Sequence, residues 1–165
     1  MKNIIPLFSA AVLFLTACSP NTRTAKTADT DLNNEKSLFA TMKMKDSYKV
    51  GEPVLLRFTV YNNADSIQQF CKWHTPFEPL MSKYLEVKKE NGEEINYQGP
   101  MAKRMMPPPA DSYVKVNPGD SLSVDVDVLK AYAIVEPAIY KIIYTGQGIS
   151  GLVVKDSVAF DYTRP

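Results

Sequence analysis

Histidine and cysteine are scarce in this chain of 165 residues, which contains one histidine and two cysteines. Zinc and iron sites combine several such ligands, so the sequence has almost no material for one. It also lacks the H-E-x-x-H and G-x-S-x-G motifs, a glycine-rich phosphate loop and a Ser–His pair in a suitable context. We therefore expect a protein that is not an enzyme and that has no metal site and no cofactor.

An excess of positive or negative charge is lacking as well. The chain has 19 basic and 18 acidic side chains, a formal net charge of +1, and no stripe of lysine and arginine. Nucleic-acid binding depends on such basic clusters, so the sequence does not favour nucleic acid as a partner. Hydrophobic residues make up 45% of the chain, which is typical of a globular protein and excludes disorder throughout.

A long hydrophobic run is also missing, because the N-terminal apolar stretch Ile4–Leu15 is shorter than the ~20 residues of a membrane-spanning helix. It follows Lys2, as in a secretory signal. The next residues, Leu15-Thr16-Ala17-Cys18, resemble the lipobox of bacterial lipoproteins. That resemblance implies cleavage before Cys18 and acylation of Cys18. The alternative is a plain signal peptide that ends near Ala17, with Cys18 incidental.

The lipobox also implies a location. Several acyl chains anchor a protein firmly to a membrane, so we expect the membrane to be a partner through Cys18. Ser19 and Pro20 follow the cysteine without an aspartate, which resembles lipoproteins sent to an outer membrane. We therefore expect a lipid-anchored protein of the cell envelope, on either the periplasmic or the surface face of the outer membrane.

The local composition divides the chain into three predicted regions. Residues 1–17 are the predicted lipoprotein signal peptide, and residues 18–37 are the lipidated cysteine and a disordered polar tether, with Leu32 as its only large apolar residue. Residues 38–163 are rich in alternating apolar and polar positions and form the predicted folded domain. With Cys18 lipidated, Cys71 has no disulfide partner, and its aromatic neighbours favour a buried inert thiol. The alternative is a catalytic thiolate, for which His74 is the only nearby base.

Period-two alternation predicts strands almost everywhere in the domain. The apolar positions are Val54, Leu56, Phe58, Val60, then Leu122, Val124, Val126, Val128, then Tyr140, Ile142, Tyr144, and finally Val158, Phe160, Tyr162. Turn signals separate these runs, and Asn91-Gly92 is a hairpin candidate. At most one helical turn is expected, around residues 128–132. Seven to nine strands predict an all-β fold, a two-sheet antiparallel sandwich.

Several segments, read together, resemble the non-catalytic immunoglobulin-like N-terminal region of deuterolysin-type (aspzincin) zinc metallopeptidases. The more specific blocks are Lys72-Trp73-His74-Thr75-Pro76 and Gly99-Pro100-Met101-Ala102-Lys103-Arg104; further segments are Phe58–Asn63, Leu85–Val87, Pro108-Pro109, Val116–Ser121, Tyr132 and Tyr140–Tyr144. The resemblance implies an immunoglobulin-like sandwich. In that family the zinc-binding H-E-x-x-H helix and an aspartate ligand lie in a following catalytic domain, which this sequence lacks. The single His74 cannot replace it.

These features predict a lipid-anchored, non-catalytic module that binds another protein. A more specific form of the hypothesis, implied by the resemblance, is docking on or restraint of a metallopeptidase. The alternative is a structural or glycan-binding envelope lipoprotein.

The candidate contact residues are Lys103, Arg104, Met105 and Met106, which precede three prolines in a long connection between strands. Prolines exclude this segment from a central strand, and adjacent methionines beside cations give an adaptable apolar surface. The alternative is a crossover between sheets with its methionines tucked over the core.

Three other features have simple structural interpretations. Trp73 is expected in the core, and His74 is expected to be exposed and unspecialised. Asp125 and Asp127 lie on one face of a strand, where paired carboxylates could do acid–base work or bind calcium. A solvated strand face is the simpler explanation, because no oxygen-rich loop motif accompanies them.

Overall fold

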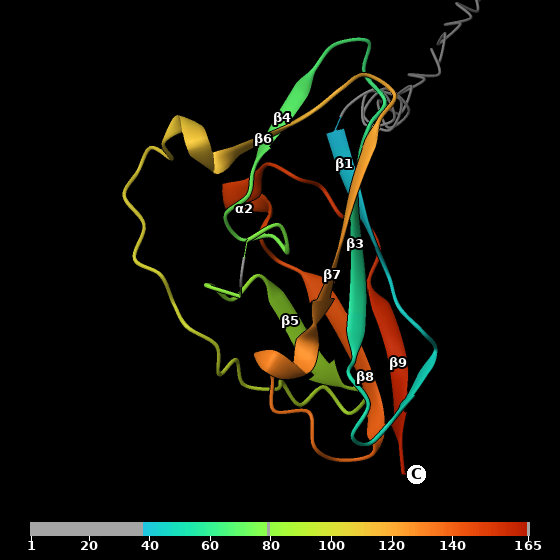
Figure 1. Ribbon diagram of the computed structural model, residues 1–165. Helices are drawn as coiled ribbons and strands as arrows, with labels where there is room; N and C mark the ends of the chain where they lie inside the picture. Colours follow the sequence, from blue (N-terminus) through green and yellow to red (C-terminus); the bar gives the residue numbers. More distant parts are fainter. Residues whose placement is uncertain (1–37, 79, 165) are drawn as a thin grey trace, which may run out of the picture.

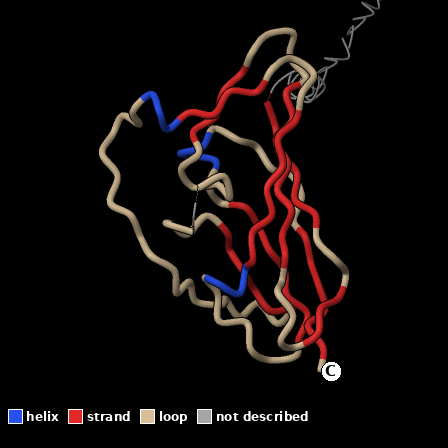
Figure 2. The backbone as a smooth tube through the Cα atoms, viewed as in Figure 1, coloured by secondary structure: helices blue, strands red, loops and turns tan. Residues whose placement is uncertain are grey.

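Strands connected by loops dominate the computed structural model, which describes residues 38–78 and 80–164 (Figure 2). Within these ranges the strands are β1 (Leu38–Lys43), β2 (Ser47–Lys49), β3 (Leu55–Asn62), β4 (Gln68–Cys71), β5 (Leu85–Lys89), β6 (Tyr113–Val116), β7 (Ser121–Asp127), β8 (Ala138–Tyr144) and β9 (Val158–Thr163). The short helices are η1 (Ala110–Ser112), η2 (Val128–Lys130) and α2 (Gln147–Ser150). None of the described helices is long and apolar enough to span a membrane. The predicted signal peptide, Cys18 and tether lie outside the described residues.

The strands form two main sheets around one core (Figure 1). One has the order β1-β3-β7 and the other β2-β9-β8-β5. The predicted all-β immunoglobulin-like sandwich is confirmed, with two details that the sequence pattern missed. The pair β4–β6 forms a small third sheet, and the short β2 pairs with β9 in parallel.

The core is built from the inward positions that the alternation predicted. In β3, Leu56, Phe58 and Val60 have no exposed surface, whereas Leu55 and Arg57 on the opposite face are exposed and Thr59 is covered to 8% exposure. β7 has a half-buried apolar face opposite an exposed serine and aspartate face. Because successive side chains of a strand point to opposite faces, each sheet contributes one dry face to the same core.

Aromatic rings fill much of the space between the sheets. Phe160 stacks on Tyr140 with 5.5 Å between ring centroids and meets Tyr48 edge-on at the same distance. Phe58 of the opposite sheet lies 5.3 Å from Tyr144. Such pairs add to the burial of large apolar areas, so the domain has a substantial core without a disulfide among its described residues.

The turn at Asn91-Gly92 follows the expected hairpin only in part. Gly92 has a φ of +88° and donates its N–H to the carbonyl of Lys89 at 2.9 Å. The chain then returns beside β5, where the N–H of Ile95 donates to Val87 at 2.8 Å. The second arm is an isolated bridge at Glu94 and not a regular strand. The predicted helical turn is present as η2.

A buried asparagine joins the end of β3 to the small β4–β6 sheet. Asn62 has no exposed surface, and its side-chain Nδ2 donates to the carbonyls of Ser66 and Val116, both at 2.9 Å. Its Oδ1 accepts from the N–H of Ala64 at 3.0 Å. One side chain thereby closes the turn after β3 and holds β6 against it, which fixes where β4 begins.

Replacement of Asn62 by leucine should destabilise the domain strongly. The leucine preserves apolar bulk but removes the amide that donates to the Ser66 and Val116 carbonyls and accepts from Ala64, at a cost of about 2–3 kcal/mol in unfolding free energy. Urea denaturation would measure the loss. The matched control Asn63→Ala, at the exposed next position, should change stability by less than about 0.5 kcal/mol. Equal effects of the two substitutions would contradict this role for Asn62.

Candidate functional site

The turn that follows β4 forms a compact corner around Trp73. Trp73 is 6% exposed, as the sequence led us to expect, and the preceding Cys71 is a buried free thiol at 2% exposure. The hydroxyl of Thr75 donates to the carbonyl of Lys72 at 2.7 Å and accepts from the N–H of Phe77 at 3.1 Å. These bonds satisfy backbone groups of the turn locally, so the Lys72–Phe77 segment has a defined shape.

The corner is tied to the four-stranded sheet through its backbone. Tyr144 of β8 donates its hydroxyl proton to the carbonyl of His74 at 3.0 Å and lies 2.7 Å from the hydroxyl of Ser150. Gly146 leaves room for this arrangement, because a Cβ there would lie 2.2 Å from the His74 carbonyl oxygen. A side chain at that position would push the corner away from the sheet.

His74 differs from its prediction. The sequence suggested an exposed histidine, but His74 is partly buried and has a φ of +59°, an uncommon conformation for a residue with a Cβ. Partial burial, and secondly the positive charge of Arg104, lower the pKa of its imidazole. The cause is tertiary, since Tyr144 and Arg104 come from distant parts of the chain.

Arg104 fastens the long 98–110 loop to this corner. Its guanidinium carbon lies 4.7 Å from the centre of the Trp73 ring, within the range of a cation–π contact. The same group forms an ion pair with Glu78, and both side chains are mostly buried, at 23% and 11% exposure. The predicted contact residue Arg104 therefore points into the domain, where it positions the loop.

The start of the loop has further attachments. The Tyr97 hydroxyl lies 2.9 Å from the carbonyl of Pro100 and 3.1 Å from that of Leu80. The N–H of Ala102 donates to the carbonyl of Met81 at 2.7 Å. Together with Arg104 these contacts hold the first half of the loop against the 80–82 segment. In Figure 1 the rest of the loop, in yellow, bows away from the sheets before η1.

The other predicted contact residues remain on the surface. Met105 is 84% exposed, Met106 65% and Met101 69%, and Lys103 is also exposed. The predicted alternative, in which the methionines tuck over the core, does not describe these side chains. Three large apolar side chains along one loop therefore remain in solvent.

The two aspartates of β7 have separate structural roles. Asp125 forms a two-pronged ion pair with Arg57 at 2.8 Å on the exposed sheet face, and this pair lowers the carboxyl pKa of Asp125. Asp127 accepts from the N–H groups of Val54 and Leu129, both at 3.2 Å, and so caps η2. Among the described residues no group of three or more histidine, cysteine or acidic side chains could hold a metal ion.

Sequence reasoning missed Glu78, Tyr97 and Tyr144 as parts of the site. Glu78 lies in a turn and has no periodic pattern around it, and nothing local links it to Arg104, 26 positions later in the chain. Tyr144 was expected only as a core residue. Their polar roles arise from the meeting of distant segments, for which one sequence carries no local signal.

Replacement of Arg104 by methionine should loosen the loop without unfolding the domain. The variant keeps an apolar stem over Trp73 but leaves the mostly buried Glu78 carboxylate without its partner, at a cost of about 2 kcal/mol. Amide hydrogen exchange of residues 98–104 should accelerate at least tenfold. Lys103→Met, at the exposed neighbouring position, is the matched control and should leave exchange unchanged. Unaltered exchange in Arg104→Met would show that the anchor lies elsewhere.

The match to a protein-family model agrees with this architecture. An immunoglobulin-like domain model matches residues 41–148. A solved structure with some similarity is the CARDB domain of a Pyrococcus furiosus protein in complex with di-metal ions, at 12% sequence identity, a TM-score of 0.35, and coverage of 78% of this chain and 88% of that chain. No curated protein matches the chain. The family model covers well over half of the sequence, and the chain therefore belongs to the immunoglobulin-like domain family, whose members are generally non-catalytic binding or structural modules.

Proposed function

We propose that this protein is a lipid-anchored, non-catalytic protein-binding module of the cell envelope, and that the 98–110 loop carries its contact surface. The observation that carries the proposal is the contrast within this loop. Arg104 is packed against Trp73 and Glu78, whereas Met105, the next residue, is 84% exposed. An anchored segment that keeps its apolar side chains in solvent is suited to docking.

Anchoring matters because binding has an entropic cost. A loop that must become ordered on docking loses conformational freedom, at about 1–2 kcal/mol for each residue that is fixed. The Arg104 contacts and the Ala102–Met81 hydrogen bond order the first half of the loop in advance, so less of the interaction energy is lost. Methionine side chains adapt to irregular apolar partners, and the exposed Lys103 adds a charge at the rim.

The suggested partner is a deuterolysin-type zinc metallopeptidase. This part of the proposal is supported by the resemblance of the domain to the non-catalytic region of those enzymes. The two blocks that carry most of that resemblance contain Trp73 and Arg104, and these residues meet in the loop anchor. Such a domain could use this loop to dock on the peptidase and restrain or position it.

Replacement of Met105 and Met106 by serine should weaken binding to the peptidase at least tenfold, because the docking surface loses its apolar area. Full-length protein in detergent would be titrated into a deuterolysin-type peptidase, with both binding and peptide hydrolysis followed. We expect a dissociation constant in the micromolar range or below for the unmodified protein.

The matched control is Val135→Ser, which removes a side chain of 72% exposure outside the 98–110 loop and should leave binding unchanged. Absence of binding at micromolar concentrations, together with full peptidase activity, would overturn the metallopeptidase assignment. A structural role in the envelope would then be the better explanation of the domain.

Replacement of Cys18 by serine should abolish lipid attachment, because only the cysteine thiol can accept the first acyl group in lipoprotein processing. Cells would be labelled with an alkyne fatty acid, and the protein would be followed by gel fluorescence and membrane sedimentation. We expect labelled, sedimenting wild-type protein and an unlabelled variant. Cys71→Ser is the matched control and should keep its label. Labelling that persists in Cys18→Ser would contradict the anchor.

A further inference from the structure

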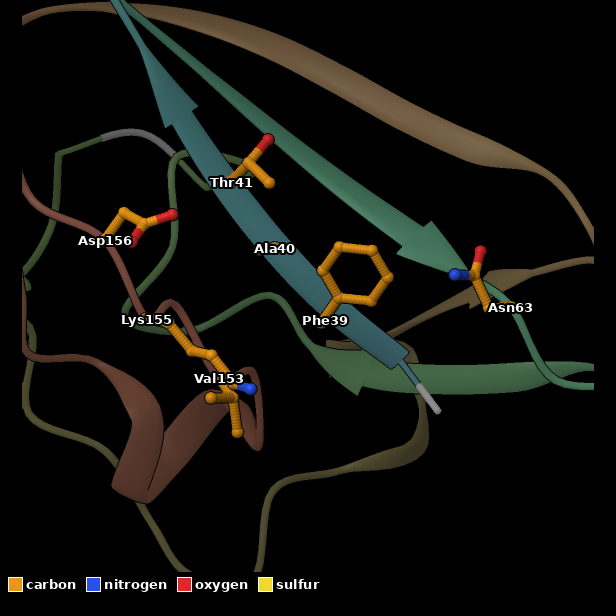
Figure 3. Close-up of a pocket in the computed structure, with 7 residues that line it drawn as sticks. All are labelled: Phe39, Ala40, Thr41, Asn63, Val153, Lys155 and Asp156. Atoms are coloured by element: carbon orange, nitrogen blue, oxygen red, sulfur yellow. The ribbon is translucent and has the colours of Figure 1, made fainter. Parts of the chain in front are cut away.

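A cavity of about 410 Å³ opens beside β1, apart from the 98–110 loop. Figure 3 shows its lining: Phe39, Ala40, Thr41, Asn63, Val153, Lys155 and Asp156. One aromatic ring, one amide, one hydroxyl, one carboxylate and one ammonium group therefore share a space of the size that small-ligand sites occupy, about 300–1,000 Å³. None of these residues belongs to the anchor around Trp73.

The cavity exists because β1 is only partly covered along one edge. β3 pairs with the whole of β1, but on the other side the N–H of Ala40 donates to the carbonyl of Val153 at 3.0 Å, within a single parallel bridge between Phe39 and Val153. Beyond this bridge the chain runs on past β1 through Lys155 and Asp156, as Figure 3 shows. The cavity lies along this part of β1 and is also lined by Asn63, which follows β3.

Phe39 gives the cavity a flat apolar wall. Its ring stacks on that of Tyr61 with 5.2 Å between centroids and 16° between the planes. Because Tyr61 covers one face, the half-buried Phe39 ring can offer only its edge and its opposite face to a ligand. The stack also restricts rotation of the ring, so the wall is present before any ligand arrives.

The polar groups of the lining have spare hydrogen-bonding capacity. Within the described part of the chain, the side chains of Thr41, Asn63 and Asp156 make no hydrogen bond or ion pair. Asn63 can donate and accept, Thr41 can do both through one hydroxyl, and the ionised Asp156 accepts. A ligand that presents several hydroxyl groups around an apolar face would satisfy all three.

We propose that this cavity binds a saccharide of one or two sugar rings. The C–H face of a sugar would lie on the free face of Phe39, and its hydroxyl edge would meet Asn63, Thr41 and Asp156. A purely apolar ligand would leave these polar groups dehydrated without partners. A phosphate would meet the ammonium group of Lys155 together with the carboxylate of Asp156, which repels it. An extended peptide would need a longer free edge of β1 than the Phe39–Val153 bridge leaves.

Saccharide binding goes beyond the proposed protein contact and is independent of it. The test uses full-length protein in detergent micelles and saturation-transfer NMR with D-glucose, D-galactose, D-mannose, N-acetyl-D-glucosamine, maltose and cellobiose. At least one of these sugars should receive saturation, strongest on the ring protons of one face, because that face lies on Phe39. Its affinity should then be measured by titration in the variants.

Phe39→Ala should weaken the affinity for that sugar at least tenfold, and Asn63→Ala should weaken it several-fold. Asn63 is exposed, so Asn63→Ala should leave the melting temperature unchanged. This variant therefore tests the site even if Phe39→Ala fails to fold. Asn96→Ala, at an exposed asparagine that lines a different depression, is the matched control and should bind normally.

Two results would overturn the proposal: no saturation of any of the six sugars, or affinity that Phe39→Ala and Asn63→Ala both leave unchanged. Binding of an extended hexapeptide at this edge in place of sugars would overturn it as well. The outcome is separate from that for the loop, because Met105→Ser with Met106→Ser should leave sugar binding intact, and Phe39→Ala should leave peptidase binding intact.

Discussion

The hydrogen bonds of the buried Asn62 amide are the interaction on which the β4–β6 sheet and the corner around Trp73 depend. The amide makes three hydrogen bonds, to the backbone of Ser66, Val116 and Ala64, in a position without solvent. The bond to the Val116 carbonyl is buried, so water cannot replace it if the amide is lost. These bonds fix the conformation of the turn after β3 and hold β6 beside it, where it pairs with β4. Trp73 follows β4, so its position depends on the same bonds.

The 98–110 loop contains one mostly buried cation and several exposed apolar side chains. The Arg104 side chain is mostly buried by its ion pair and its aromatic contact, whereas the side chains of Met101, Met105 and Met106 are exposed. A loop with three adjacent prolines at its end and a cationic anchor near its centre has few conformations to lose on binding. Trp73 and Arg104, which meet at this anchor, come from sequence blocks that are far apart in the chain.

Family membership describes the scaffold, and function has to be argued from particular sites on it. An immunoglobulin-like sandwich presents loops at its ends and sheet edges at its sides. Here the two proposed sites are the anchored loop and the cavity beside β1. They share no residue, so one domain can carry a protein contact and a small-ligand site without competition between them.

The sequence by itself determined the all-β class, the inward faces of β3, β7, β8 and β9, the burial of Trp73 and Cys71, and the turn at η2, because local alternation and turn residues encode them. Only the tertiary structure decided that Arg104 points inward, that His74 is partly buried, that β2 pairs in parallel with β9, and that a cavity opens beside Phe39. These features depend on contacts between segments far apart in the chain, such as Glu78 with Arg104 and Phe39 with Val153. The sequence around each of these residues would be equally compatible with a structure in which the two segments do not meet. A local pattern therefore cannot predict the contact.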